Sequence, residues 1–155
     1  MSYRIVGLEP DQFQALFRMS DAELAERHII RKSVDAKPGF PCRVTLEDAE
    51  PGETVQLLNF EHQTALTPYR SSHAIFVREN ARQRYDEVDQ VPPALRSRTL
   101  SVRAFDATGM MIDADIVEGE HLESLIDRLF AEKNTAYLHV HNAKRGCFAA
   151  RVERA

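Results

Sequence analysis

The chain has 155 residues, of which 43% are hydrophobic and 28% are charged, a composition typical of globular proteins that excludes a disordered tail. Its net charge of −4 argues against a nucleic-acid-binding surface, which is normally basic. No apolar run approaches the roughly 20 residues that span a bilayer, and Met1–Val6 lacks the apolar core of a signal peptide. We therefore expect one cytoplasmic domain over residues 1–155, with no nucleic-acid partner and no membrane partner.

Short elements are predicted in the first half of the chain. A strand over Tyr3–Leu8 precedes a helical stretch that begins near Pro10. The capping-box pattern of Ser20 and Glu23 predicts a second short helix that ends near Arg27. Alternating apolar residues and flanking turn residues predict three further strands at Ile29–Val34, Thr54–His62 and His73–Glu79.

The second half carries the clearest helix and two hairpins. After a polar connection over residues 80–93, a hairpin is expected around Gly109, which can take a positive φ. Apolar residues at helical spacing then predict the longest helix, at Leu122, Leu125, Ile126, Leu129 and Phe130. A last hairpin follows. Strands and helices do not alternate regularly, so we predict an α+β fold: a mostly antiparallel sheet with one long and one or two short helices packed on it.

The last hairpin carries most of the reactive side chains. With a turn at Asn142–Gly146, Val140 is expected opposite Phe148, and Leu138 opposite Ala150. The predicted core face then contains Leu138, Val140, Phe148, Ala150 and Val152. The opposite face contains Tyr137, His139, His141, Cys147 and Arg151, with His141 opposite Cys147. A reactive site is therefore expected on this second face.

The two cysteines suggest thiol chemistry. Cys42 precedes an arginine in a proline-rich loop, and Cys147 follows a Lys-Arg-Gly turn. A neighbouring cation stabilises a thiolate, and His139 or His141 would serve as the base. These four residues are the catalytic candidates of a small thiol-dependent or redox enzyme. Inert packing of either cysteine and a reversible Cys42–Cys147 disulfide are the alternatives, the latter requiring Cα atoms within about 7 Å.

The same face also carries side chains that can bind a metal ion. His139, His141 and Cys147 are expected to converge there, and Cys42 or His62 would supply a fourth ligand. Their spacing matches none of the standard zinc motifs, with no Cys-x-x-Cys and no His-Glu-x-x-His. The sequence therefore predicts no metal and no cofactor.

Arginine and hydroxyl groups suggest anion binding. The segment from Tyr69 to Ser72 holds a phenol, a guanidinium and two hydroxyls. Our first hypothesis is a pocket for a small anionic ligand, lined by the hairpin's polar face and by Arg43, Tyr69, Arg70, Ser72 and Arg145. The thiol enzyme is the second hypothesis. The third is a non-catalytic interaction module that acts through a sheet edge or as a homodimer, so the sequence leaves open whether the protein is an enzyme.

Several short segments together resemble a bacterial family known as domain of unknown function 1203. They are Pro41-Cys42-Arg43, Pro51-Gly52-Glu53 with Leu57-Leu58, Pro68-Tyr69-Arg70-Ser71, Ile75-Phe76-Val77 and Arg145-Gly146-Cys147-Phe148. The chain differs from this family at His73-Ala74, where the family has Gly-Pro. The resemblance implies a similar length and fold, and it carries over no activity, cofactor or site residue.

Overall fold

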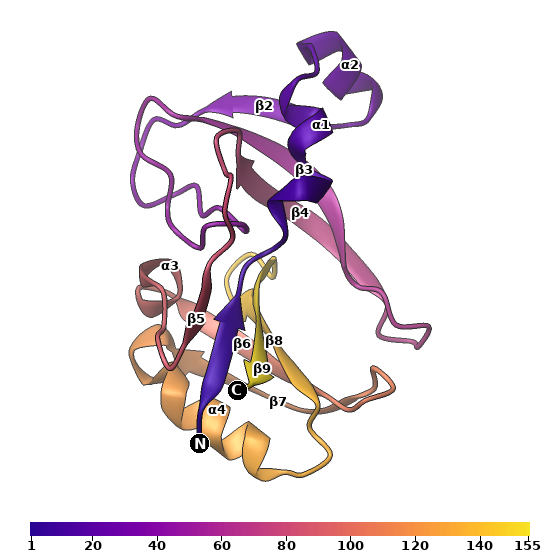
Figure 1. Cartoon of the computed structure of the whole chain (residues 1–155), viewed down its shortest axis with the longest axis vertical. Helices are drawn as coiled ribbons and strands as arrows, with labels where there is room; N and C mark the ends of the chain where they lie inside the picture. Colours follow the sequence, from indigo (N-terminus) through magenta and orange to yellow (C-terminus); the bar gives the residue numbers. More distant parts are fainter.

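The computed structural model describes residues 1–155 and contains two antiparallel sheets (Figure 1). The larger sheet has the strand order β5 (Asp86–Val88), β1 (Tyr3–Val6), β9 (Phe148–Arg154), β8 (Tyr137–Asn142), β6 (Thr99–Phe105) and β7 (Met111–Glu118). The smaller sheet has the order β2 (Ile30–Ser33), β3 (Thr54–Gln63) and β4 (Ser71–Arg78). The predicted α+β class with mostly antiparallel strands is confirmed, although the strands form two sheets.

Helices of different lengths accompany the two sheets. The longest is α4 (Leu122–Ala131), and the shorter ones are η1 (Pro10–Gln12), α1 (Gln14–Phe17), α2 (Asp21–Glu26), α3 (Pro93–Arg96) and η2 (Gly119–His121). None of them has the length and apolar character that a membrane-spanning helix requires.

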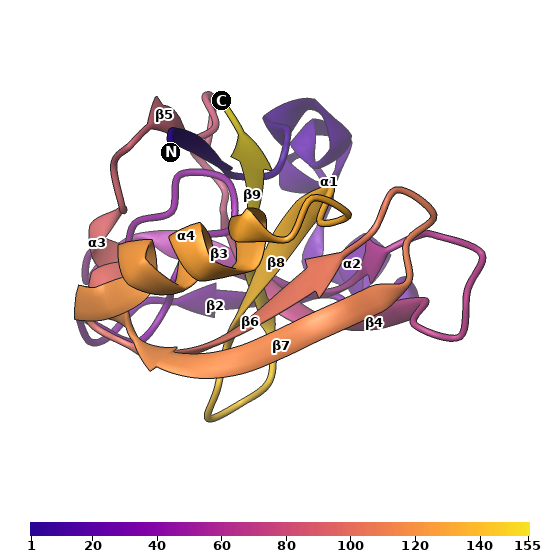
Figure 2. The ribbon, with the colours of Figure 1, turned by 90° about the horizontal axis from the view of Figure 1, so that it is seen from below.

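Helix α4 lies across one face of the larger sheet (Figure 2). All five of its predicted apolar positions are buried, and they pack with residues of β6 and β8 such as Val102 and Val140 in the largest core cluster. Burying one such side chain stabilises the fold by about 1.5–3 kcal/mol. The amphipathic pattern therefore explains why this helix forms and which face it covers.

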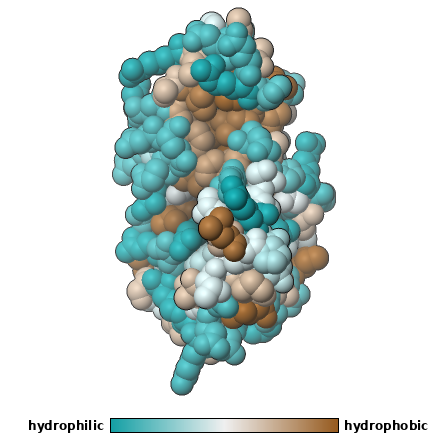
Figure 3. Space-filling model, turned by 90° about the vertical axis from the view of Figure 1, so that its right-hand side faces the viewer, coloured by the Kyte–Doolittle hydropathy of each residue, from teal (hydrophilic) through white to brown (hydrophobic).

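The smaller sheet has its own core with α1 and α2. The predicted capping box is present, because the Glu23 amide donates to Ser20 Oγ and the Ser20 amide donates to Glu23 Oε1, both at 3.2 Å. Helix α2 buries Leu24 against a cluster that includes Ile75 and Val77. Figure 3 shows an apolar surface over this half of the molecule. Its partly buried hydrophobic residues are Leu8, Leu16, Phe17, Met19 and Phe60.

The region predicted as a plain surface connection differs in the structure. It contains the short strand β5, which pairs with β1 at the sheet edge, and it ends in α3. All three residues of β5 are exposed, so its sequence shows no apolar alternation. Its contacts with β1 are backbone hydrogen bonds and an ion pair between Arg4 and Asp86, and neither produces the period-two apolar pattern by which a strand is predicted.

The register of the last hairpin also differs from the prediction. Leu138 pairs with Val152 and Val140 with Ala150, two residues further along β9 than expected. A two-residue shift preserves the faces, so these four residues remain in the core. A β-bulge then leaves Ala149 without an opposite residue and places His141 opposite Phe148. Phe148 therefore joins the histidine face, and the predicted pairing of His141 with Cys147 is wrong.

The loop that contains Arg43 lies between the two sheets. The Arg43 amide donates to the Phe76 carbonyl in β4, and the Arg43 carbonyl accepts from the Leu8 amide after β1. The next carbonyl, of Val44, accepts from the Tyr85 amide. These backbone bonds hold the loop against both halves of the molecule and fix the direction of the Arg43 side chain.

Candidate functional site

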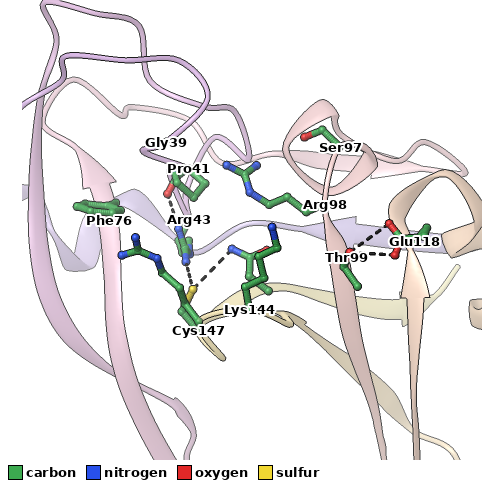
Figure 4. Close-up of a pocket in the computed structure, with 12 residues that line it drawn as sticks. Gly39, Pro41, Arg43, Phe76, Ser97, Arg98, Thr99, Glu118, Lys144 and Cys147 are labelled. Atoms are coloured by element: carbon green, nitrogen blue, oxygen red, sulfur yellow. Dashed lines mark hydrogen bonds between the residues drawn. The ribbon is translucent and has the colours of Figure 1, made fainter.

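A cavity of about 350 Å³ lies where the two sheets meet the turn of the last hairpin (Figure 4). The half with the smaller sheet contributes Gly39, Pro41, Arg43 and Phe76. The other half contributes Ser97, Arg98, Thr99 and Glu118, and the hairpin turn contributes Asn142, Lys144, Arg145 and Cys147. The turn is closed by hydrogen bonds from the Asn142 amide to the Cys147 carbonyl and from the Gly146 amide to the Asn142 carbonyl.

Arg43 is the most buried charge of this cavity. Its side chain donates from Nε to the Phe148 carbonyl at 2.7 Å, from Nη1 to the Pro41 carbonyl at 2.5 Å and from Nη2 to Cys147 Sγ at 2.8 Å. No carboxylate accepts from it, and the residue is only 2% exposed. Burial lowers the pKa of Arg43, and the charge of nearby Arg98 acts in the same direction.

Cys147 and Cys42 occupy different surroundings. Cys147 Sγ borders the cavity and accepts hydrogen bonds from Arg43 and, at 3.6 Å, from Asn142 Nδ2 (Figure 4). Cys42 is buried in the core of the smaller sheet, where its sulfur accepts from the Arg78 amide at 3.4 Å. Both thiols are free. Neither sulfur has a histidine among its hydrogen-bond partners, so the predicted cysteine–histidine pairs do not form.

The charges around the cavity do not balance. Arg98 is paired with Asp48 through two hydrogen bonds, and Glu118 accepts from the Thr99 hydroxyl. Lys144 and Arg145 are exposed and form no ion pair within the chain. Together with Arg43, they leave the cavity with a surplus of positive charge, which favours an anionic occupant.

Three of the ligand-binding residues predicted from the sequence lie elsewhere. Tyr69 packs edge-on against Phe105, with ring centroids 6.4 Å apart. Arg70 is exposed and paired with Glu61, and Ser72 is exposed on β4. Of the predicted set, only Arg43 and Arg145 line the cavity. The segment from Tyr69 to Ser72 resembles an anion-binding motif in the sequence, but in the structure Arg70 is already paired with the Glu61 carboxylate.

The histidines of the last hairpin form a second cluster with a residue of the smaller sheet. His62, near the end of β3, joins His139 and His141, and one potential ligand nitrogen from each lies within 4.8 Å of the others. The His62 ring stacks on Phe148, with centroids 5.5 Å apart and an interplanar angle of 7°. The bulge that moves Phe148 to this face therefore also completes the wall of the cluster.

Burial controls the charge of these histidines. It lowers the pKa of His62 to about 4 and the pKa values of His139 and His141 to about 3. The positive charge of Arg103, whose Nη1 lies 3.4 Å from His141 Nε2, adds to the effect. All three rings are therefore neutral at pH 7.

Sequence reasoning did not assign Asn142, Arg98 or Lys144 to the cavity. Lys144 could have been predicted from the sequence, because it directly precedes Arg145 in the same exposed turn. Arg98 could not have been predicted, because its position depends on how α3 packs against the loop that contains Asp48. The sequence also placed Cys147 among the metal-ligand candidates, whereas the structure brings His62 to that position.

Comparisons with curated proteins and with solved structures found no match to this chain. The model of one family matches residues 39–154, which include every residue that lines the cavity, both cysteines and all three clustered histidines. The family is described as "Protein of unknown function (DUF1203)", in agreement with the resemblance noted in the sequence. The chain therefore belongs to the DUF1203 family.

Proposed function

We propose that this protein binds a small anionic ligand, a carboxylate or a phosphate, in the cavity between Arg43, Lys144 and Arg145. The observation that carries the proposal is the surplus of positive charge: Lys144 and Arg145 have no carboxylate partner, and the buried Arg43 has none either. A buried guanidinium without a counter-charge is costly, and an anion in the cavity would offset that cost.

The lining also supplies a neutral hydrogen-bond donor for such a ligand. Asn142 borders the same space, and its amide keeps one N–H free beyond the hydrogen bond to Cys147, whereas the Ser97 and Thr99 hydroxyls already donate to Pro93 and Glu118. The cavity volume of about 350 Å³ is at the small end of the range for ligand pockets, which favours a metabolite over a large cofactor.

Thermal unfolding in the presence of phosphate, sulfate, succinate and citrate tests this proposal. A ligand that binds only the native state raises its stability, by about 2.7 kcal/mol at one hundred times the Kd. We expect at least one of these anions to raise the Tm of the protein in a concentration-dependent manner. Glucose, which has similar polarity and no charge, should leave the Tm unchanged.

A pair of double variants localises the effect. Lys144→Ala/Arg145→Ala removes the two exposed cations of the cavity and should abolish most of the Tm shift. Lys32→Ala/Arg82→Ala is the matched control, because it removes two exposed positive charges elsewhere on the surface. An equal Tm shift in the two double variants, or no shift with any of the four anions, would refute the proposal.

Thiol chemistry by Cys147 is the second candidate function. It is favoured by one contact, the 2.8 Å hydrogen bond from Arg43 Nη2 to Cys147 Sγ. Cys147 is the only group among the Arg43 acceptors that can become an anion, and a thiolate there would be stabilised by the guanidinium. In this function the Cys147 thiolate would be the nucleophile, held by Arg43 and with no histidine as base.

Alkylation with two reagents of different charge tests this second function. We expect Cys147 to react faster than Cys42, and to favour the anion iodoacetate over neutral iodoacetamide more than a free thiol does. Cys147→Ser should remove the fast reaction, and phosphate should slow it in the unmodified protein. Equal rates for the two cysteines, or an unperturbed preference between the reagents, would refute the thiol function and leave anion binding untouched.

A further inference from the structure

The histidine cluster lies outside the proposed anion site and has no part in it. His139 and His141 are 3% and 1% exposed, and His62 is partly buried. Two elements from different sheets bring them together, since His62 belongs to β3 and the other two to β8. Three imidazoles are rarely buried side by side in a protein interior, because each ring carries two polar nitrogens that need hydrogen-bond partners.

Two of the buried nitrogens have no partner. His62 Nδ1 and His139 Nδ1 are inaccessible to solvent and form no hydrogen bond. Leaving a buried polar atom unpaired costs about 1–3 kcal/mol. Neutral imidazole nitrogens that are held together without hydrogen-bond partners are suited to coordinate a metal ion, which would satisfy them.

His141 has the hydrogen bond that orients a metal ligand. Its Nδ1 lies 3.0 Å from the Gly146 carbonyl, and because a carbonyl oxygen only accepts, Nδ1 carries the proton. The lone pair is therefore on Nε2, where it accepts a hydrogen bond from Arg103 Nη1 at 3.4 Å that a bound metal ion would replace. A ligating histidine commonly donates its other ring N–H to a backbone carbonyl in this way.

We propose that His62, His139 and His141 form a binding site for one Zn²⁺ ion. Zinc takes imidazole nitrogen at about 2.0–2.1 Å, and three protein ligands leave a fourth position for water or an anion. Nitrogens in tetrahedral geometry around zinc lie roughly 3.4 Å apart. The three nitrogens lie within 4.8 Å of one another in the metal-free protein, so zinc binding requires a modest contraction of the cluster.

The nitrogen ligands and the charge of Arg103 together restrict which class of metal fits. Its charge faces the cluster and opposes any cation that enters, and no carboxylate pairs with it. Ca²⁺ and Mg²⁺ need oxygen ligands, which the cluster lacks, so they gain nothing to offset that repulsion. A transition metal is held by the nitrogen lone pairs themselves. Removing the arginine charge should therefore strengthen zinc binding.

Calorimetric titration of EDTA-treated protein with Zn²⁺ tests the proposal. We expect one equivalent to bind, and His62→Gln to weaken the affinity by more than about 100-fold, because even residues that only orient a ligand contribute 10–100-fold. Arg103→Gln should raise the affinity. His121→Gln, at an exposed histidine, and Cys147→Ser, at the cavity thiol, should leave it unchanged.

Co²⁺ provides a spectroscopic readout of the same site. Bound Co²⁺ should show the visible absorption of tetrahedral coordination without the near-ultraviolet band of a thiolate ligand. His62→Gln is the principal variant because His62 is the least buried of the three, and its fold is checked by circular dichroism. A thiolate band, no stoichiometric Zn²⁺ binding, or undiminished affinity in folded His62→Gln would overturn the assignment.

Discussion

The cavity and the histidine cluster lie along the same hairpin, and they differ in whether their buried polar atoms form hydrogen bonds. In the cavity, the guanidinium of Arg43 is almost fully buried and has three hydrogen-bond acceptors. In the cluster, two buried ring nitrogens have none. The hydrogen bonds of Arg43 therefore offset part of the cost of burying its charge, whereas nothing offsets the cost of the two histidine nitrogens. Each region keeps an uncompensated polar group that a ligand would satisfy, a positive charge in the cavity and unpaired ring nitrogens in the cluster.

The largest expected effect is the loss of the Arg43 hydrogen bonds. Arg43→Leu leaves the carbonyls of Pro41 and Phe148 buried without a donor, so we expect the free energy of unfolding to fall by about 4 kcal/mol. Urea denaturation measures the change. Arg145→Ala, an exposed arginine in the same cavity, should change it by less than about 0.5 kcal/mol. A small effect of Arg43→Leu would show that the buried hydrogen bonds stabilise less than we infer.

The pH dependence of stability should report the other region. The three histidines have pKa values of about 4, 3 and 3 when folded, below the value of about 6.5 in an unfolded chain. The unfolded state therefore takes up more protons as the pH falls below about 6.5, and the metal-free protein loses stability until the pH reaches the folded values.

Urea denaturation of EDTA-treated protein at several pH values between about 7 and 4 measures this loss. Carboxylates contribute to the same trend, so the informative quantity is the difference between variants. His139→Gln should flatten the dependence on pH, and His121→Gln should not. A parallel pH dependence in His139→Gln and the unmodified protein would contradict the burial that we assign to His139.

A smaller effect of opposite sign is expected from removing an unpartnered nitrogen. His139→Leu replaces a buried ring whose Nδ1 has no partner with an apolar side chain of similar size. We expect the metal-free protein to gain up to about 1 kcal/mol in urea denaturation, and the gain to disappear when Zn²⁺ is added to both proteins. A loss of stability without metal would mean that His139 has a partner in solution.

The smallest effect is expected outside both regions. Arg70 pairs with Glu61 at the surface, and both side chains are well exposed. Arg70→Ala should therefore change the free energy of unfolding by less than about 0.5 kcal/mol and leave the anion-induced Tm shift intact. If the Tm shift disappeared, the anion site would include the segment around Tyr69, as the sequence suggested.

The sequence predicted local features well where a periodic pattern or a cap decides the structure. The five apolar positions of α4 and the Ser20–Glu23 capping box both follow from short-range spacing. Gly109 also takes the positive φ, of 87°, that its turn requires. These features depend on residues within one or two helical turns of each other, so the sequence contains the information needed.

The sites were less predictable because they depend on contacts between distant segments. Arg43 meets Cys147 across 104 positions, and His62 reaches two residues of a strand from the other sheet. The alternation of the last hairpin placed His139 and His141 on one face, but no local pattern selects His62 over Cys42 as their neighbour, because that depends on how the two sheets meet. The exposed strand β5 was missed for a different reason, since its pairing uses backbone groups that every sequence possesses.

The β-bulge at Ala149 has a consequence for protein engineering and for the evolution of the hairpin. It separates the pairing of Leu138 and Val140, which anchors the core, from the pairing of the segment that follows the turn. The turn residues 143–145 are exposed or partly buried, so their composition can vary while the core ladder stays in place. Grafting a different turn at this point would redesign the cavity chemistry in a protein that still folds around the same hydrophobic centre.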